Sequence, residues 1–172
     1  MTALIRCTKK LLTEIPADLV DAAAGGDGWH ANLLRIERRK CVLFTHDVTL
    51  YSVFVPALKK PAFDRLPEVF AERLFKTLLW EEFPQPQIEV MLDAVRVVHF
   101  GRSNNRSVLG SMNDLQFQIE VYVHYDGGLD STDLVDLHRR LNRTPMSAVG
   151  YGYPVERLRE YTAARVSGLA GH

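Results

Sequence analysis

Polar side chains that could hold an anion gather ahead of one long amphipathic segment of the chain. The residues that gather there are Arg102, Asn104, Asn105, Arg106 and Ser107. A helix that begins at this point would direct its free backbone N–H groups and the positive end of its dipole toward them. Guanidinium, amide and hydroxyl groups at such an end suit a phosphate, a carboxylate or another polar partner. We therefore predict a binding site in residues 102–114.

Two further polar residues, Asn113 and Asp114, follow within the same segment. An amide next to a carboxylate could hold a divalent cation, although one carboxylate is few for a metal site. Together with Arg106 and His30 they are the plausible members of the dispersed site of a small hydrolase or nuclease, which is the alternative to a non-enzymatic binding module. The same segment also fits a plain capped helix start, and that arrangement is the commoner one.

Trp29 and His30 come immediately before the apolar runs of the first half. Both rings could stack on a base or line a cleft, so His30 is counted with the candidate binding residues. A hydrophobic lid formed by Trp29 over a satisfied histidine is the reading that we favour. His46 and Asp47 are neighbours in a predicted turn and could act as a base with its acid, but adjacent residues on a turn rarely face one another.

The common catalytic and metal-binding motifs are missing from the sequence. It contains no P-loop, GxGxxG, GxSxG or HExxH pattern, and its six histidines show neither HxxxH nor HxH spacing. Cys7 and Cys41 form no CxxC pair and fall in predicted strands, which indicates buried structural thiols. We expect no metal and no cofactor, and we favour binding over catalysis.

The charge balance limits the class of partner. Lys+Arg and Asp+Glu both total 21, so the formal net charge is zero, which argues against a general nucleic-acid coat. Local basic clusters at residues 35–40 and 139–143 could still follow a nucleic-acid backbone, although they also fit solvated turns and a helix end. The expected partner is an unidentified protein or nucleic acid. A homo-oligomeric scaffold, using exposed apolar residues such as Trp80 and Phe83, is a third reading.

The chain shows no signal peptide and no apolar stretch of membrane-spanning length. We therefore expect a cytoplasmic protein with reduced thiols and no membrane partner. Its 172 residues fit a single domain, β-rich over residues 1–58 and helical over residues 62–166.

Apolar periodicity predicts an α+β fold. An N-terminal antiparallel sheet of about four strands is expected to pack with four to five C-terminal helices. The expected strands are residues 3–8, 31–37, 41–45 and 51–55, and residues 95–100 could add another. Residues 106–125 fit a 4-3-4-3 helical spacing, while part of them also alternates like a strand, and we favour the helix. Asp130 or Ser131 is expected to cap the next helix.

Four blocks of the sequence resemble an uncharacterised bacterial family, a domain of unknown function that occurs as a stand-alone chain. The blocks are residues 5–12, residues 29–33 with 38–41, residues 106–114 (RSVLGSMND) and residues 141–154. They extend over nearly the whole chain, and RSVLGSMND is the most specific of them. The resemblance implies one domain with a β-rich first half and a helical second half. It implies no catalytic residue.

Overall fold

A five-stranded mixed sheet organises the chain in a computed structural model that describes residues 2–16, 18–20 and 28–170. Its strand order is β4-β3-β2-β1-β5. The strands are β1 (Thr2–Cys7), β2 (Gly28–Ile36), β3 (Arg39–His46), β4 (Ser52–Leu58) and β5 (Val97–Arg102). The meander β2-β3-β4 is antiparallel, as its spacing predicts. The α+β class is confirmed.

The sheet is mixed and has five strands, which corrects the expected antiparallel sheet of about four strands. The further strand expected near residues 95–100 is confirmed as β5. β1 lies between β2 and β5 and pairs in parallel with both. A parallel pair needs a long crossover rather than a hairpin, and the residue pattern of a single strand does not reveal which kind of partner it has. The crossover from β1 to β2 contains the short helix α1 (Lys9–Leu12). β5 comes from the otherwise helical half of the chain.

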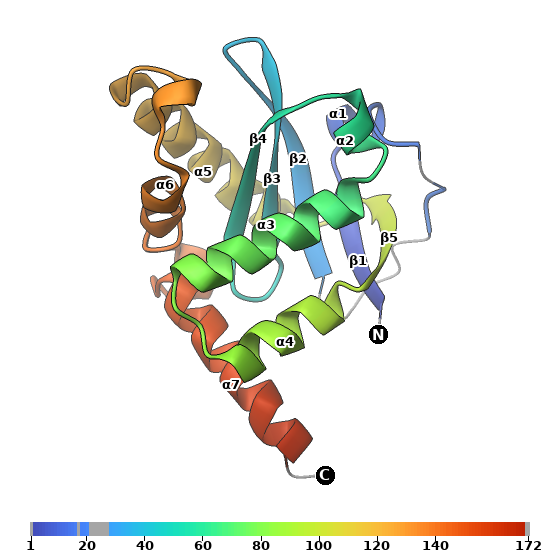
Figure 1. Ribbon diagram of the computed structural model, residues 1–172, viewed down its shortest axis with the longest axis vertical. Helices are drawn as coiled ribbons and strands as arrows, with labels where there is room; N and C mark the ends of the chain where they lie inside the picture. The colour runs from blue at the N-terminus through green and yellow to red at the C-terminus, as the bar shows by residue number, and fades with distance from the viewer. Residues whose placement is uncertain (1, 17, 21–27, 171–172) are drawn as a thin grey trace.

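Helices cover both faces of this sheet. In Figure 1, α3 crosses in front of the strands, α4 lies below α3 near the lower strand ends, and α5 lies behind the strands. After α1, the helices are α2 (Lys60–Phe63), α3 (Leu66–Trp80), α4 (Gln85–Ala94), α5 (Arg106–Tyr125), α6 (Leu134–Leu141) and α7 (Pro154–Ala170). No helix over the described residues is both long enough and apolar enough to cross a membrane.

The helical interpretation of residues 106–125 is confirmed, and the alternating strand interpretation is wrong. The buried residues of α5 recur at helical spacing, with Val108, Met112 and Leu115 among them. The expected cap of α6 is also wrong. Asp133 is the N-cap, and its side chain accepts hydrogen bonds from the backbone N–H groups of the second and third residues that follow. The two residues proposed as caps, 130 and 131, lie in a separate 3₁₀ turn.

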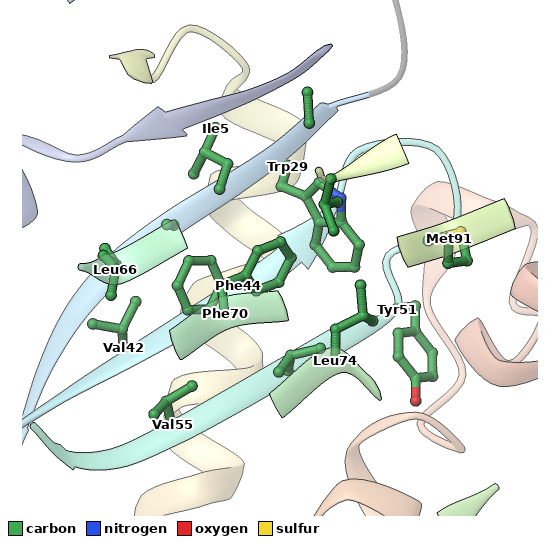
Figure 2. Close-up of a cluster of buried hydrophobic side chains, with 14 of the residues drawn as sticks. Ile5, Trp29, Val42, Phe44, Tyr51, Val55, Leu66, Phe70, Leu74 and Met91 are labelled. Carbon is green, nitrogen blue, oxygen red and sulfur yellow. The ribbon is translucent and has the colours of Figure 1, made fainter. Parts of the chain in front are cut away.

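Each face of the sheet has its own apolar core. On the front face, Phe44 stacks on Phe70 with ring centroids 4.3 Å apart, and Trp29 meets Phe70 edge-on at 4.8 Å. Figure 2 shows these three rings together, with Met91 on the same side of the sheet. On the rear face, the buried residues of α5 and α6 pack against residues such as Phe54. Because both faces are buried, the strand ends and edges are the remaining parts of the sheet open to partners.

Side chains of α6 close the outer edge of β4. Asn142, just after α6, accepts a hydrogen bond from the backbone N–H of Ser52 at 2.8 Å and donates to its carbonyl at 3.0 Å. The Nε2 atom of His138 accepts from the backbone N–H of Phe54 at 2.9 Å, while its Nδ1–H donates to the carbonyl of Leu134 at 2.7 Å. These bonds satisfy backbone groups that an edge strand would otherwise expose to other chains.

We expect the edge closure by His138 to weaken in acid. Burial lowers the pKa of His138 from 6.5 to about 4, so the folded protein keeps this ring neutral where the unfolded chain binds a proton. The free energy of unfolding should therefore fall as the pH drops from about 6.5 toward 4, by roughly 3 kcal/mol for this group. Urea unfolding across that pH range measures the effect.

Two variants isolate the histidine that is responsible. His138→Gln should lose this part of the pH dependence, because an amide does not titrate. His124→Gln changes an exposed histidine of α5 and should keep the wild-type profile. The same pH dependence in wild type and His138→Gln would contradict the assignment.

Candidate functional site

The residues predicted to bind an anion lie at the exposed start of α5. The side chains of Arg102, Asn105, Arg106 and Ser107 are exposed, and Asn104 is exposed beside them. The side-chain oxygen of Asn105 accepts hydrogen bonds from the backbone N–H groups two and three residues later, at 3.0 and 3.1 Å. The helix start is therefore capped from within the chain. That this segment binds an anion or a polar partner stays a prediction.

The residues of the hydrolase alternative are not brought together. Asn113 and Asp114 are exposed on α5, whereas His30 is fully buried on the sheet. Over residues 2–16, 18–20 and 28–170, no three His, Cys, Asp or Glu side chains are grouped so that they could hold a metal ion. Among the described residues, Asp114 therefore belongs to no such ligand set.

A buried charged cluster, formed by Arg6, His30 and Asp47, is the main feature that the sequence did not reveal. Asp47 accepts a hydrogen bond from Nδ1 of His30 at 2.6 Å and forms an ion pair with Nη1 of Arg6 at 2.9 Å. The Arg6 and His30 side chains are 6% and 1% exposed. Their strands place them together, because Arg6 and His30 are direct partners in the β1–β2 register.

The suggested pairing of His46 with Asp47 does not form. The His46 ring lies on the front face of the sheet, and its Nδ1 atom is 2.9 Å from the Thr49 hydroxyl. Asp47 turns instead to His30, 17 residues earlier in the chain. The only sequence signal for this cluster was a single arginine, Arg6, inside the apolar first strand.

The Arg6 cluster requires a glycine beside it. A Cβ atom on Gly28 would lie 2.7 Å from the carbonyl oxygen of Leu4 and 3.1 Å from Nη1 of Arg6. The first contact is too short for carbon, and the second would require the guanidinium to move by a few tenths of an ångström, so a larger residue at position 28 would displace β1. The absence of a side chain at Gly28 lets the carboxylate and the guanidinium meet within the sheet.

Two nitrogen atoms of the cluster, Nε of Arg6 and Nε2 of His30, are buried without a hydrogen-bond partner among the described residues. A histidine held by a carboxylate at Nδ1 is oriented like a general base, with Nε2 as the reactive atom. Here the ring is fully buried, so a substrate cannot reach Nε2 in this conformation. The cluster is thus a structural element rather than an accessible catalytic site.

The basic cluster at residues 139–143 is partly used within the fold. Arg143 donates to both carboxylate oxygens of the buried Glu81, at 2.9 and 2.7 Å, and Arg139 donates to the carbonyl of Trp80. These bonds tie the end of α6 to the end of α3.

Phe83, which was expected to be exposed at a contact surface, is buried.

An open cavity of about 490 Å³ lies between α4, α7 and the sheet; we call it the α4–α7 cavity. The sheet contributes the start of β1 (Thr2 and Ala3), Trp29 of β2 and His46 of β3. α4 and the residue after it contribute Val90, Met91, Asp93, Ala94 and Val95, and α7 contributes Tyr161, Ala164, Arg165, Gly168 and Leu169. The innermost lining is apolar and aromatic, and the exposed side chains lie mainly on the two helices.

The floor of the α4–α7 cavity is held firmly by aromatic contacts. Trp29, 3% exposed, contacts His46 with ring centroids 5.0 Å apart, and His46 meets Tyr161 at 4.9 Å in an edge-on arrangement. The expectation that Trp29 forms a hydrophobic lid over a satisfied histidine is wrong. His30 is hydrogen-bonded at Nδ1, but its Nε2 atom is buried without a partner among the described residues, so it is not fully satisfied. Trp29 contacts His46 instead of His30, and it lines the cavity rather than covering a histidine as a lid.

The cavity and the predicted anion site lie at opposite ends of β1. Thr2 and Ala3 line the cavity and pair with the start of β5, whereas Arg102 pairs with Cys7 at the other end of the same two strands. Cys7 is buried there, and desolvation raises the pKa of its thiol to about 12. The thiol therefore stays protonated, which fits the expected structural role.

Comparison with protein families identifies the chain. A family model described as a domain of unknown function (DUF6933) matches residues 4–157. The chain belongs to this family. The resemblance carried by the four sequence blocks is thus confirmed as membership of an uncharacterised domain family. The DUF6933 match includes the Arg6 cluster, Trp29, His46 and α4, and it ends before the residues of α7 that line the cavity. No curated protein and no solved structure matches the chain.

We expect removal of the Asp47 carboxylate to destabilise the DUF6933 fold strongly. Asp47→Ala would leave the Arg6 guanidinium buried without its counter-charge, and such a loss costs about 3–5 kcal/mol. Asp114→Ala is the matched control, because it removes an exposed carboxylate of α5, and it should change the free energy of unfolding by less than about 0.5 kcal/mol. Urea unfolding at neutral pH compares the two. Equal effects of both substitutions would contradict a structural role for the cluster.

Proposed function

We propose that this protein is a non-enzymatic binding module that takes a small, largely apolar molecule into the α4–α7 cavity. The observation that carries the proposal is the cavity itself, with its buried aromatic floor. Its volume of about 490 Å³ falls in the range of small-molecule sites, roughly 300–1,000 Å³. Such sites combine a mainly apolar lining with a few polar groups that orient the ligand. Here the polar groups come from residues such as His46 and Arg165.

The rigidity of the floor supports binding. Trp29 and His46 are fixed on neighbouring strands, where they are direct partners in the β2–β3 register. Trp29 is further held by Phe70 of α3, and the Nδ1 atom of His46 by Thr49. A ligand that contacts these rings would not need to order them first, so less of its binding free energy would be lost to conformational entropy.

The chemistry of the chain supports binding more than catalysis. The histidine that is oriented by a carboxylate, His30, is sealed inside the protein. The remaining candidates of the hydrolase alternative, Arg106, Asn113 and Asp114, are exposed on a helix surface. We also infer a cytoplasmic location, since both cysteines are free and buried, as reducing compartments allow.

Binding should be visible in the fluorescence of Trp29. The chain has two tryptophans, so a Trp80→Phe background leaves Trp29, in the cavity floor, as the single reporter. Titration with the neutral apolar probe N-phenyl-1-naphthylamine should change this fluorescence in a saturable way, with one probe bound per chain. The physical reason is that the probe would displace water from apolar surface next to the indole ring.

A pair of glycine substitutions provides the control. Gly168 lines the cavity and Gly110 lies on α5, and a Cβ atom added to either would meet nothing within 4 Å. Gly168→Phe should weaken probe binding at least about tenfold by filling the mouth of the cavity, whereas Gly110→Phe should bind like the parent. Failure to observe saturable binding, or equal effects of the two substitutions, would overturn the proposed function.

A further inference from the structure

One stripe of α7 runs along the α4–α7 cavity from its floor to solvent. The residues of α7 that line the cavity recur at the spacing of a single helix face, and they are Tyr161, Ala164, Arg165, Gly168 and Leu169. At the inner end of the stripe, the Tyr161 ring meets His46 in the floor. At the outer end, Leu169 is an apolar side chain that is 68% exposed. The cavity therefore follows the axis of this helix.

Helix geometry gives the length of the stripe. Leu169 follows Tyr161 by two turns of α7, which corresponds to about 12 Å along the axis at roughly 1.5 Å per residue. Carbon–carbon bonds of about 1.5 Å at tetrahedral angles advance an extended alkyl chain by about 1.3 Å per carbon. A chain of about nine or ten carbons would thus reach from the floor to Leu169.

The two helices meet at the inner end of the cavity. There the hydroxyl of Thr162, the residue after Tyr161, donates a hydrogen bond to Oε1 of Gln87 in α4 at 2.9 Å. Beyond this contact, α7 continues outward past α4 toward the end of the chain (Figure 1). A ligand longer than the stripe would extend into water, where further carbons gain nothing from burial.

The charged side chains of the described lining, Asp93 and Arg165, both have contacts within the chain. Asp93 forms an ion pair with Arg96, and the Cζ atom of Arg165 lies 3.5 Å from the centroid of the Tyr161 ring. An uncharged ligand would leave both contacts in place. A charge brought to the floor would lose its hydration beside apolar and aromatic groups, which is costly. The enclosed part of the ligand is therefore expected to be uncharged.

We propose that the ligand of this cavity is an unbranched, uncharged apolar chain of about nine or ten carbons that lies along α7. This inference rests on the proposed function, and it adds the shape and the length of the ligand. One end of the chain would lie on the floor, against Trp29 and the buried Met91 and Val95. The other end would cover Leu169.

The test is a series of 1-alkanols from 1-hexanol to 1-dodecanol. Each is titrated below its solubility limit into the Trp80→Phe protein, with Trp29 fluorescence as the readout. The Kd should fall about three- to fourfold for each added methylene, as burial of one such group implies, and should level off at about nine or ten carbons. A Kd that falls by the same factor through 1-dodecanol, or that does not depend on chain length, would overturn the inference.

Neighbouring alanines of α7 provide a matched pair of variants. Ala164 lies in the lining and Ala163 lies outside it, and both are exposed. Ala164→Phe should weaken the binding of 1-decanol at least about tenfold and move the plateau to shorter chains, because the ring would occupy part of the stripe. Ala163→Phe should reproduce the parent series. Identical series for the two variants would count against a ligand lying along α7.

The neutral probe separates the failure of this inference from that of the proposed function. If N-phenyl-1-naphthylamine binds and no alkanol does, the alkyl-chain inference is overturned and the cavity remains a binding site. If neither the probe nor any alkanol binds, both proposals are overturned.

Discussion

A sheet that is covered on both faces and whose β4 edge is hydrogen-bonded to other side chains leaves its strand ends among the places where a ligand can approach. The faces of this sheet are buried under α3 and α4 on one side and α5 on the other (Figure 1). At one edge, Asn142 and His138 take the hydrogen bonds of β4. At the other, the backbone N–H of Val20 donates to the carbonyl of Phe100 in β5 at 2.9 Å. The candidate sites follow from this closure.

The two ends of β1 differ in what they offer. At the end near Cys7, the start of α5 is exposed but is already capped by Asn105. At the opposite end, the outward course of α7 past α4 leaves a cavity over the sheet. Between the two ends lies the buried Arg6 cluster. Burying its charged groups costs desolvation free energy, which the hydrogen bonds among Arg6, His30 and Asp47 offset. Stability and the proposed binding thus rest on different groups.

Local patterns in the sequence were sufficient to predict the helix and strands whose apolar residues recur at regular spacing. The spacing of Val108, Met112, Leu115 and Ile119 identifies α5, since each faces the same core. The meander of β2, β3 and β4 follows likewise from apolar runs separated by short turns. The parallel position of β1 did not follow, because strand periodicity is the same for either direction of pairing.

The candidate sites depend on contacts that local patterns do not encode. His30 and Asp47 are 17 residues apart and meet only through the register of β2 and β3. The sequence argument correctly held that His46 and Asp47 would not face one another. It could not identify His30 as the partner of Asp47. The cavity is less predictable still. Its wall on α7 includes Ala164 and Gly168, small residues that no apolar pattern selects.

The most direct test of the binding site is to map it residue by residue in solution. Amide chemical shifts of the ¹⁵N-labelled protein would be followed by NMR during titration with N-phenyl-1-naphthylamine. The proposed function predicts that the largest shifts occur at Thr2, Ala3 and the parts of α4 and α7 that line the cavity. Shifts concentrated in residues 102–114 instead, or scattered over the surface without saturation, would contradict it.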